Sequence, residues 1–204
     1  MKYYSQDGQD KFLVEELFKD KKNGFYVDIG ANDGISLSNT KILEDIGWNG
    51  ICVEPLPLSF NKLLSNRKCI KHNLAVSEVN GKLQFLQIDG YSEMLSGLFE
   101  TYDPRHLERI NRELNTYGGT KKIIDVDSVR FSDLVNEKEI DYISIDVEGS
   151  ELNVIKSIDF DKHNIFCISV ENNYGTNEVE NYLNNFGFKF LRNVGADNFF
   201  IKNK

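Results

Sequence analysis

Short apolar runs alternate with amphipathic stretches along most of the chain. The apolar runs, which suit buried strands because turn residues bound them, cover 25–29, 51–53, 83–88, 140–145, 165–170, 186–191 and 198–201. The amphipathic stretches have helical period and cover 10–18, 37–46, 59–64, 152–158 and 178–186. This alternation predicts an α/β fold in which parallel βαβ units form a doubly wound, three-layer sandwich. The last two runs lie close enough together to form a terminal hairpin.

One stretch, 87–127, interrupts this alternation and has only a modest helical pattern near 106–114. Because long loops inside compact domains are usually functional or mobile, we interpret it as an inserted lid that contacts a substrate. A surface excursion without function is the alternative. Within this stretch His106, beside Arg105, is a candidate substrate contact, and a packing role is its alternative. The chain as a whole, 1–204, is expected to be a single domain.

Composition narrows the classes of partner. The 204 residues suffice for one domain with a real core. A net charge of −8 disfavours nucleic acids and anionic membrane surfaces as partners. No apolar run approaches the roughly 20 residues that span a bilayer, and the polar start disfavours a signal peptide. We therefore expect a cytoplasmic protein whose three cysteines, Cys52, Cys69 and Cys167, are reduced, and we leave a homodimer open.

A glycine-spaced turn follows the first apolar run. The residues from Tyr26 to Gly34 read YVDIGANDG, and such a turn at the carboxyl end of a strand lets a ligand approach the backbone. The carboxylates of Asp28 and Asp33 repel a pyrophosphate and attract an ammonium group. The turn therefore predicts a ligand site, and a tight strand-to-helix connection without a ligand is the simpler alternative.

A further carboxylate, Glu54, ends the next apolar run, 26 residues after Asp28. In this layout the acid at the end of the second strand accepts hydrogen bonds from both ribose hydroxyls, and Pro55 stops the strand. A ribose diol beside an ammonium site, without a pyrophosphate site, favours an adenosyl ligand that carries an amino acid over a dinucleotide. A solvated strand-end charge is the alternative for Glu54 taken alone.

Two further strand ends carry oxygen-bearing side chains. Asp146 and Glu148 follow one apolar run, and Glu171 and Asn172 follow the next. If the two strands are neighbours, Asp146, Glu171 and Asn172 converge as oxygen ligands for a divalent cation such as Mg²⁺ or Mn²⁺. Such an ion lowers the pKa of a hydroxyl group, and Glu148 or Glu151 then accepts the proton. Asp146, Glu148 and Glu171 are thus the candidate catalytic residues, and a helix cap with ordinary loop residues is the alternative.

Several segments resemble one known family. They are SQDGQD (5–10), FYVDIGANDG (25–34), SNT (38–40), GWNGICVEP (47–55), NLAVS (73–77) and ISIDVEGSELNVI (143–155). In this order and at these spacings they are similar to the FkbM family of S-adenosylmethionine-dependent methyltransferases. The resemblance spans nearly the whole chain, and only the inserted stretch lies outside it.

The resemblance implies a class I methyltransferase fold, which is a Rossmann-like three-layer sandwich with a mostly parallel seven-stranded sheet and a C-terminal antiparallel hairpin. It also implies transfer of a methyl group from S-adenosylmethionine to an oxygen, often on a sugar, a glycan or a glycosylated small molecule. By matching position, the residues expected at the cofactor are Gln6 or Gln9, Asp28, Gly30, Asn32, Asp33 of the same turn, Glu54, Asn73 and Ala75.

Related metal-dependent O-methyltransferases bind magnesium through the acids after the fourth and fifth strands. By resemblance, these acids correspond to Asp146, Glu171 and Asn172. Those relatives commonly carry a basic residue three positions beyond the first metal-binding acid, where this chain has Gly149. The identity of the catalytic base therefore stays open.

Two other functions are compatible with the sequence. An NAD-dependent oxidoreductase shares the strand-end acid for ribose, although the acid-rich turn lacks the third glycine of a dinucleotide site. A methyltransferase fold without catalytic activity, retained as a binding module, predicts cofactor binding without turnover.

Overall fold

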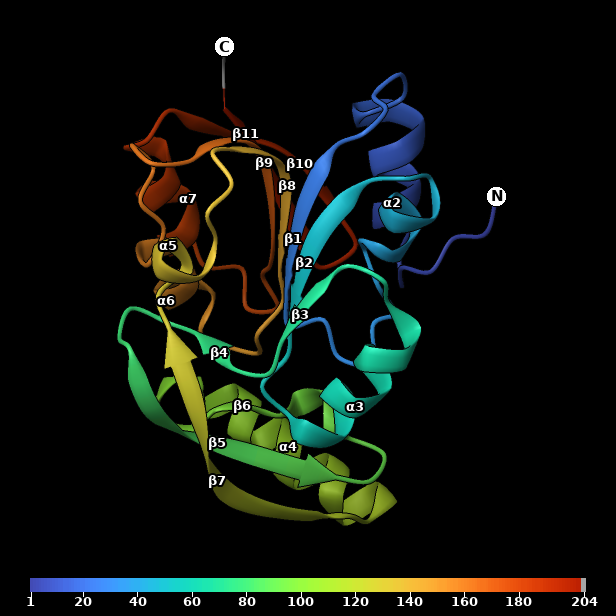
Figure 1. Ribbon diagram of the computed structural model, residues 1–204. Coiled ribbons are helices and arrows are strands. Elements are labelled where there is room, and N and C mark those ends of the chain that lie inside the picture. Colours follow the sequence, from blue (N-terminus) through green and yellow to red (C-terminus); the bar gives the residue numbers. More distant parts are fainter. Residues whose placement is uncertain (203–204) are drawn as a thin grey trace.

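A seven-stranded sheet runs through the centre of the computed structural model, which describes residues 1–202 (Figure 1). Its strands, in spatial order, are β10 (Phe188–Val194), β11 (Asp197–Lys202), β9 (Asn164–Glu171), β8 (Glu139–Ile145), β1 (Phe25–Ile29), β2 (Asn49–Val53) and β3 (Ile70–His72). Neighbouring strands are parallel except at β11, which is antiparallel to both β9 and β10. The predicted fold class, with its mostly parallel sheet and C-terminal antiparallel hairpin, is therefore confirmed.

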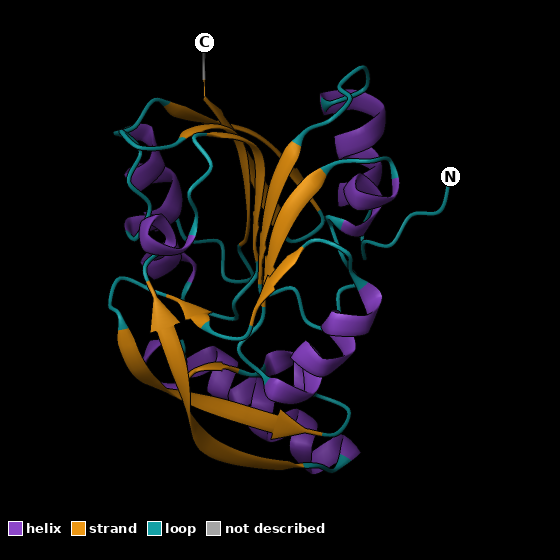
Figure 2. Cartoon of the chain, viewed as in Figure 1, coloured by secondary structure: helices purple, strands orange, loops and turns teal. Residues whose placement is uncertain are grey.

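Helices cover both faces of this sheet (Figure 2). One face carries α5 (Phe131–Leu134), α6 (Glu151–Lys156) and α7 (Glu178–Asn184), and the other carries α1 (Gln9–Phe12), the π-helix Leu13–Leu17, α2 (Lys41–Asp45) and α3 (Pro57–Asn66). Because side chains alternate along a strand, Val27 and Ile29 of β1 pack on the first face and Tyr26 packs on the second. All of these helices except α5 overlap the stretches predicted as helical. None of the helices within residues 1–202 is long and apolar enough to cross a membrane.

A second, four-stranded sheet lies beyond the carboxyl ends of the parallel strands, in the lower part of Figure 1. Its strands, in spatial order, are β4 (Ala75–Val76), β7 (Thr120–Val129), β5 (Gly81–Asp89) and β6 (Gly97–Leu98). Two short 3₁₀ helices, Glu93–Leu95 and Phe99–Thr101, and α4 (Pro104–Tyr117) also lie between β5 and β7 along the chain. One side of β5 packs on α4 through Ile88, and the other side contacts Leu56 and Ala75 through Phe85.

One prediction about this part of the chain is wrong. The run 83–88 does not belong to the main sheet, because it lies in β5 and pairs with β7 along its full length. Its place in the main sheet is taken by β3, which forms no apolar run because this edge strand is not buried. The stretch 87–127 begins in β5, ends in β7 and contains α4, which covers the helical pattern near 106–114, and its role as a lid stays a prediction.

Candidate active site

A cavity with an empty volume of about 680 Å³ lies where the carboxyl ends of β1, β2 and β8 face the second sheet. We call it the strand-end cavity. The main sheet and its loops line one side of the cavity with Ile29, Gly30, Asn32, Val53, Glu54, Asp146 and Glu148. The other side is lined by the second sheet and the segments that connect its strands, which we call the second-sheet region. Its lining residues are Phe85, Glu93, Met94, Ser96 and Leu98. The residues of this second group were not predicted, because their place depends on how the second sheet packs.

Gly30 and Asn32 bring the backbone after β1 to the wall of this cavity. Gly30 has a φ of 89°, and a Cβ atom there would lie 1.7 Å from the carbonyl oxygen of Asp146. Only glycine therefore lets the ends of β1 and β8 approach so closely. Asn32 also has a left-handed backbone, with a φ of 47°, which asparagine tolerates better than most residues.

The Glu54 carboxylate lies at the cavity in a defined orientation. Its Oε2 accepts a hydrogen bond from the Asn32 N–H at 2.9 Å, and its Oε1 accepts one from the Leu56 N–H at 2.7 Å. Only 6% of Glu54 is exposed, and this burial raises the pKa of the carboxyl group to about 7. Two backbone donors thus hold a buried acid that retains free lone pairs for hydroxyl donors of a ligand.

The NLAVS segment lies next to Glu54. Asn73 Nδ2 donates to the carbonyl oxygens of Glu54 at 2.8 Å and Pro55 at 3.0 Å, so its side chain holds the turn after β2. Asn73 itself does not line the cavity, whereas Ala75 of β4 does. Of these two predicted cofactor residues, Ala75 therefore lies at the cavity, whereas Asn73 only supports the turn beside it.

The structure does not place the Asp28 carboxylate at the cavity. Strand β1 ends at Ile29, so Asp28 is inside the strand and its side chain points to the face opposite that of Val27 and Ile29. There Oδ2 accepts a hydrogen bond from the Thr40 hydroxyl and lies 3.6 Å from Arg67 Nη1. Burial raises the pKa of Asp28, and Arg67 opposes this shift. The expected contact between Asp28 and a ligand ammonium group is thus corrected.

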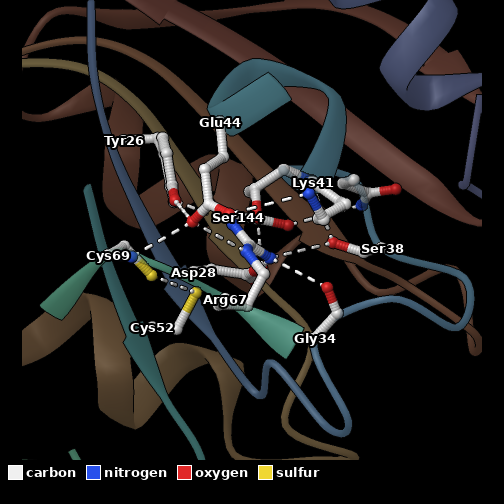
Figure 3. A network of polar contacts seen from close by, with 12 residues as sticks. Tyr26, Asp28, Gly34, Ser38, Lys41, Glu44, Cys52, Arg67, Cys69 and Ser144 are labelled. Carbon is white, nitrogen blue, oxygen red and sulfur yellow. Dashed lines mark hydrogen bonds and ion pairs between the residues drawn. The ribbon is translucent and has the colours of Figure 1, made fainter. Parts of the chain in front are cut away.

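Arg67, at the end of α3, is the centre of the polar network around Asp28 (Figure 3). Its side chain is fully buried, and it donates to Tyr26 Oη at 2.8 Å, Thr40 Oγ1 at 2.9 Å, the Gly34 carbonyl at 3.2 Å and Glu44 Oε2 at 3.2 Å. We call Tyr26, Asp28, Thr40, Glu44 and Arg67 the Arg67 cluster. Through the Gly34 carbonyl, this cluster holds the GANDG turn. Sequence reasoning missed Arg67, because a single arginine in a polar helix end carries no pattern.

Two other predicted cofactor residues lie away from the cavity. Asp33 Oδ1 accepts hydrogen bonds from the N–H groups of Ile35 at 2.8 Å and Ser36 at 2.7 Å, so its carboxylate shapes its own turn. Gln6 is exposed and Gln9 is buried, and neither lines the strand-end cavity. The side chains of Asp33, Gln6 and Gln9 therefore do not line the strand-end cavity, and their contact with a cofactor stays a prediction.

Three carboxylates meet after β8 and at the end of β9. One oxygen each of Asp146, Glu148 and Glu171 lies within 4.8 Å of the others, and we call these residues the acidic cluster. Loss of surrounding water in this concave site, together with mutual repulsion, raises the pKa of Asp146 and Glu148 well above the usual range and that of Glu171 to about 7. Oε2 of Glu148, whose side chain is 13% exposed, has no hydrogen-bond partner among the described residues. The cluster therefore has excess negative charge.

Asn172 is not part of the acidic cluster. Its Nδ2 donates to the Thr176 carbonyl at 2.9 Å and its Oδ1 accepts from the Thr176 N–H at 3.0 Å, which closes a local loop. Asn172 thus makes local hydrogen bonds, while it lines the same hollow as Glu148 and Glu171, and its role as an oxygen ligand stays a prediction. Glu151, the other candidate base, accepts hydrogen bonds from the N–H groups of Gly149 at 2.9 Å and Val147 at 3.4 Å and caps the turn before α6.

A second hollow, with an empty volume of about 890 Å³, adjoins the acidic cluster. The second-sheet region lines it with Tyr102 and His106, and the loop after β9 lines it with Tyr174. His106 stacks on Tyr102 with the ring centroids 4.8 Å apart, and its Nδ1 lies 3.1 Å from Tyr174 Oη. Glu148 lines both this hollow and the strand-end cavity. The inserted stretch therefore contributes to two adjacent spaces that meet at one carboxylate.

Comparisons with known proteins complete this description. A family model described as the methyltransferase FkbM domain matches residues 28–190. The chain is also similar to a crystal structure of a TehB-like SAM-dependent methyltransferase from Corynebacterium glutamicum, with 11% identity, 99% of this chain and 89% of that chain covered, and a TM-score of 0.44. A structure called delta-N METTL16 MTase domain is 14% identical over 93% of this chain and 77% of that chain, with a TM-score of 0.41. No curated protein matches the chain.

Proposed function

The chain belongs to the FkbM methyltransferase family, and from that premise we propose that it is an O-methyltransferase that acts on a hydroxyl group of a sugar, a glycan or a glycosylated small molecule. Membership in this family implies S-adenosylmethionine as the methyl donor. We further propose that a divalent metal ion assists the reaction. The observation that carries the proposal is the Glu54 carboxylate, which two backbone N–H groups hold at a partly apolar cavity at the strand ends.

The donor is proposed to bind in the strand-end cavity. Glu54 would accept hydrogen bonds from the ribose hydroxyls, because its carboxylate is fixed and faces the cavity. Gly30 and Asn32 would contact the donor through their backbone. Leu56 and Ala75 line the cavity beside Glu54 and offer an apolar surface for the adenine ring.

The amino-acid end of the donor is proposed to lie toward Asp146. Asp28 cannot serve it directly, because its carboxylate is bound to Thr40 and Arg67. Asp146 is an exposed acid that lines the same cavity as Glu54 and belongs to the acidic cluster. An ammonium group there would reduce the excess negative charge of that cluster.

The acceptor is proposed to bind in the second hollow. Methyl transfer requires the acceptor oxygen in line with the methyl group and about 3 Å from it, so the donor and acceptor spaces must touch. They do so at Glu148, which lines both. Tyr102 and Tyr174 in the second hollow combine an aromatic face with a hydroxyl group, which suits a sugar ring.

The acidic cluster suits a hard divalent ion such as Mg²⁺ or Mn²⁺. Three carboxylates offer oxygen ligands within 4.8 Å of one another, and Oε2 of Glu148 has no hydrogen-bond partner within residues 1–202. The chemistry that such an ion supplies is a lower pKa of the acceptor hydroxyl. Asp146, Glu148 and Glu171 would hold it.

Calorimetry with S-adenosylhomocysteine tests the donor site. We expect the wild type to bind, and Glu54→Gln to bind roughly 100-fold more weakly, because two hydrogen bonds to a carboxylate are weakened. Glu108→Gln on the exposed side of α4 is the matched control and should bind like the wild type. A wild type that does not bind S-adenosylhomocysteine overturns the proposed function.

Activity measurements with sugar and glycoside acceptors test the O-methyltransferase part and the metal part of the proposal separately. Methyl transfer to a hydroxyl oxygen supports the O-methyltransferase assignment, and transfer only to nitrogen contradicts it. The metal part fails on its own if turnover survives both chelation and Asp146→Ala.

A further inference from the structure

Cys52 and Cys69 form a close thiol pair outside the candidate active site (Figure 3). Cys52 is in β2 and Cys69 directly precedes β3, and their Sγ atoms lie 3.4 Å apart. Both pack in the core on the face of the sheet opposite to Val53, which lines the strand-end cavity. Neither thiol lines that cavity or the second hollow. The proposed methyl transfer therefore does not use this pair.

The backbone around Cys69 is held in place. Its N–H donates to Glu44 Oε2 at 3.2 Å, and its carbonyl oxygen accepts a hydrogen bond from Lys71 Nζ at 2.9 Å. The same Glu44 oxygen accepts from Arg67 Nε at 3.2 Å. The Arg67 cluster thus fixes Cys69 beside Cys52, so the pair does not depend on a chance encounter of two mobile loops.

The two thiols differ in access and acidity. Cys69 is partly exposed, and a hydrogen bond with the Cys52 thiol and the nearby Arg67 charge lower its pKa. Cys52 is fully buried, and burial raises its pKa. The third cysteine, Cys167, is also fully buried with a raised pKa, and it provides an internal comparison. Cys69 is therefore the thiol that an oxidant reaches first, and Cys52 is the thiol placed to react with it next.

We propose that Cys52 and Cys69 are an oxidation site that closes to an intramolecular disulfide in the presence of a low-molecular-weight disulfide. The Cys69 thiolate attacks one sulfur of that oxidant, a mixed disulfide forms and one small thiolate leaves. The Cys52 thiol then loses its proton to solvent, its sulfur attacks the Cys69 sulfur, and the second small thiol leaves. Two protein thiols are thereby oxidised and one small disulfide is reduced to two thiols.

Closure of the disulfide requires the sulfur atoms to approach from 3.4 Å to about 2.05 Å. Because Cys52 pairs with Lys71 in the register of β2 and β3, Cys69 lies diagonally across from it, so the backbone that leads into β3 must also shift. The new bond would join β2 to the start of β3 across α3, and it would restrict the unfolded chain between residues 52 and 69. The disulfide is therefore expected to stabilise the fold without entering either of the two hollows.

Peptide mapping of the full chain after treatment with oxidised glutathione tests this proposal. We expect two of the three thiols to be lost and trypsin to release fragment 42–62 linked to fragment 69–71. Cys167, in fragment 163–189, should remain free. The midpoint of thermal unfolding should rise by roughly 5–10 °C and return to its initial value with dithiothreitol.

Two variants assign the order of the steps. Cys52→Ala should retain a glutathione mixed disulfide at Cys69, because no second thiol displaces it. Cys69→Ala should leave Cys52 unreacted. The wild-type result alone already decides the matter: a folded protein that keeps all three thiols, stops at the mixed disulfide or forms only disulfides between chains overturns the proposal.

Discussion

The Arg67 cluster and the acidic cluster both contain aspartate and glutamate side chains but differ in how these charges are balanced. In the first, the buried Arg67 guanidinium lies between Asp28 and Glu44, and hydroxyl and backbone groups complete the hydrogen bonds. In the second, three carboxylates converge and Oε2 of Glu148 has no hydrogen-bond partner in the described part of the chain. The Arg67 cluster lies on one face of the main sheet, because side chains alternate along β1. The acidic cluster lies at the carboxyl ends of β8 and β9.

The pKa shifts express this difference. Burial opposes ionisation of Glu44, but Arg67 and the N–H groups of Lys68 and Cys69 outweigh it and hold the pKa of Glu44 below its usual range. Burial and neighbouring carboxylates instead raise the pKa of Glu171 to about 7. A balanced charge network is typical of a structural role, whereas crowded carboxyl groups with raised pKa values are typical of a site that binds a ligand.

The largest expected effect comes from removal of the central cation. Arg67→Met should lower the free energy of unfolding by about 3–5 kcal/mol, because it leaves Asp28 and Glu44 buried without their partner. Urea denaturation measures this loss. Arg112→Met, on the exposed side of α4, is the control and should change stability by less than about 0.5 kcal/mol. A loss as small as that of the control would mean that other groups balance the Arg67 cluster, and the comparison would break.

Addition of a divalent ion should affect only the acidic cluster. With Mg²⁺ or Mn²⁺ at about 100 times its dissociation constant, we expect a gain of about 2.7 kcal/mol in stability. Asp146→Asn should abolish most of this gain, and Glu44→Gln should retain it. Thermal unfolding with and without a chelator provides the measurement, and an equal gain in wild type and Asp146→Asn would assign the ion to another place.

Matched Glu→Gln substitutions should change the free energy of unfolding in opposite directions in the two clusters. Near pH 8 and without metal, Glu44→Gln should lose about 1–2 kcal/mol because it weakens charged hydrogen bonds. Glu171→Gln should gain about 1–2 kcal/mol because it removes repulsion.

The sign for Glu171 follows from its raised pKa. The folded state holds the proton up to about pH 7, while the unfolded chain loses it near pH 4.3, so ionisation costs stability as the pH rises through this interval. The gain from Glu171→Gln should therefore fade below about pH 7. The loss from Glu44→Gln should instead fade on acidification, because Glu44 stabilises the fold only when ionised. Urea denaturation over a pH series measures the change in stability that each substitution causes. If both substitutions change stability in the same direction, the contrast between the two clusters is contradicted.

An exposed ion pair gives the smallest effect. Lys62 of α3 lies 3.4 Å from Glu93 in the second-sheet region, with the two side chains 52% and 40% exposed. Lys62→Ala should change stability by less than about 0.5 kcal/mol, and salt should reduce even this, because water screens both charges. A loss above about 1 kcal/mol would show that this contact holds the second sheet against α3.

The sequence predicted the main sheet well and the second sheet poorly. Strands and helices such as β1, β8 and α6 have a local period that is readable without their neighbours. β3 has no such period, and the antiparallel partner of β5 lies about 40 residues further along the chain in β7. Because residues that pair at this distance leave no joint pattern in one sequence, the second sheet could not be predicted.

The candidate site was predicted in part for a similar reason. The positions of Gly30 and Glu54 follow from short motifs at strand ends, and both lie at the strand-end cavity. Asp28 was misplaced because β1 extends one residue beyond it, and one residue reverses the face to which a side chain points. The hydrogen bonds of the Asn172 amide group to Thr176 could not be predicted from the strand-end pattern.

The amino-acid sequence by itself determined the alternation of strands and helices and the presence of acids at the ends of β2, β8 and β9. Each of these features depends only on residues that lie near one another in the sequence. Only the tertiary structure decided which acids are balanced. Arg67 reaches Asp28 from 39 positions away, and Glu148 meets Glu171 from the end of another strand. Charge balance depends on distance in space, and chain folding alone sets that distance.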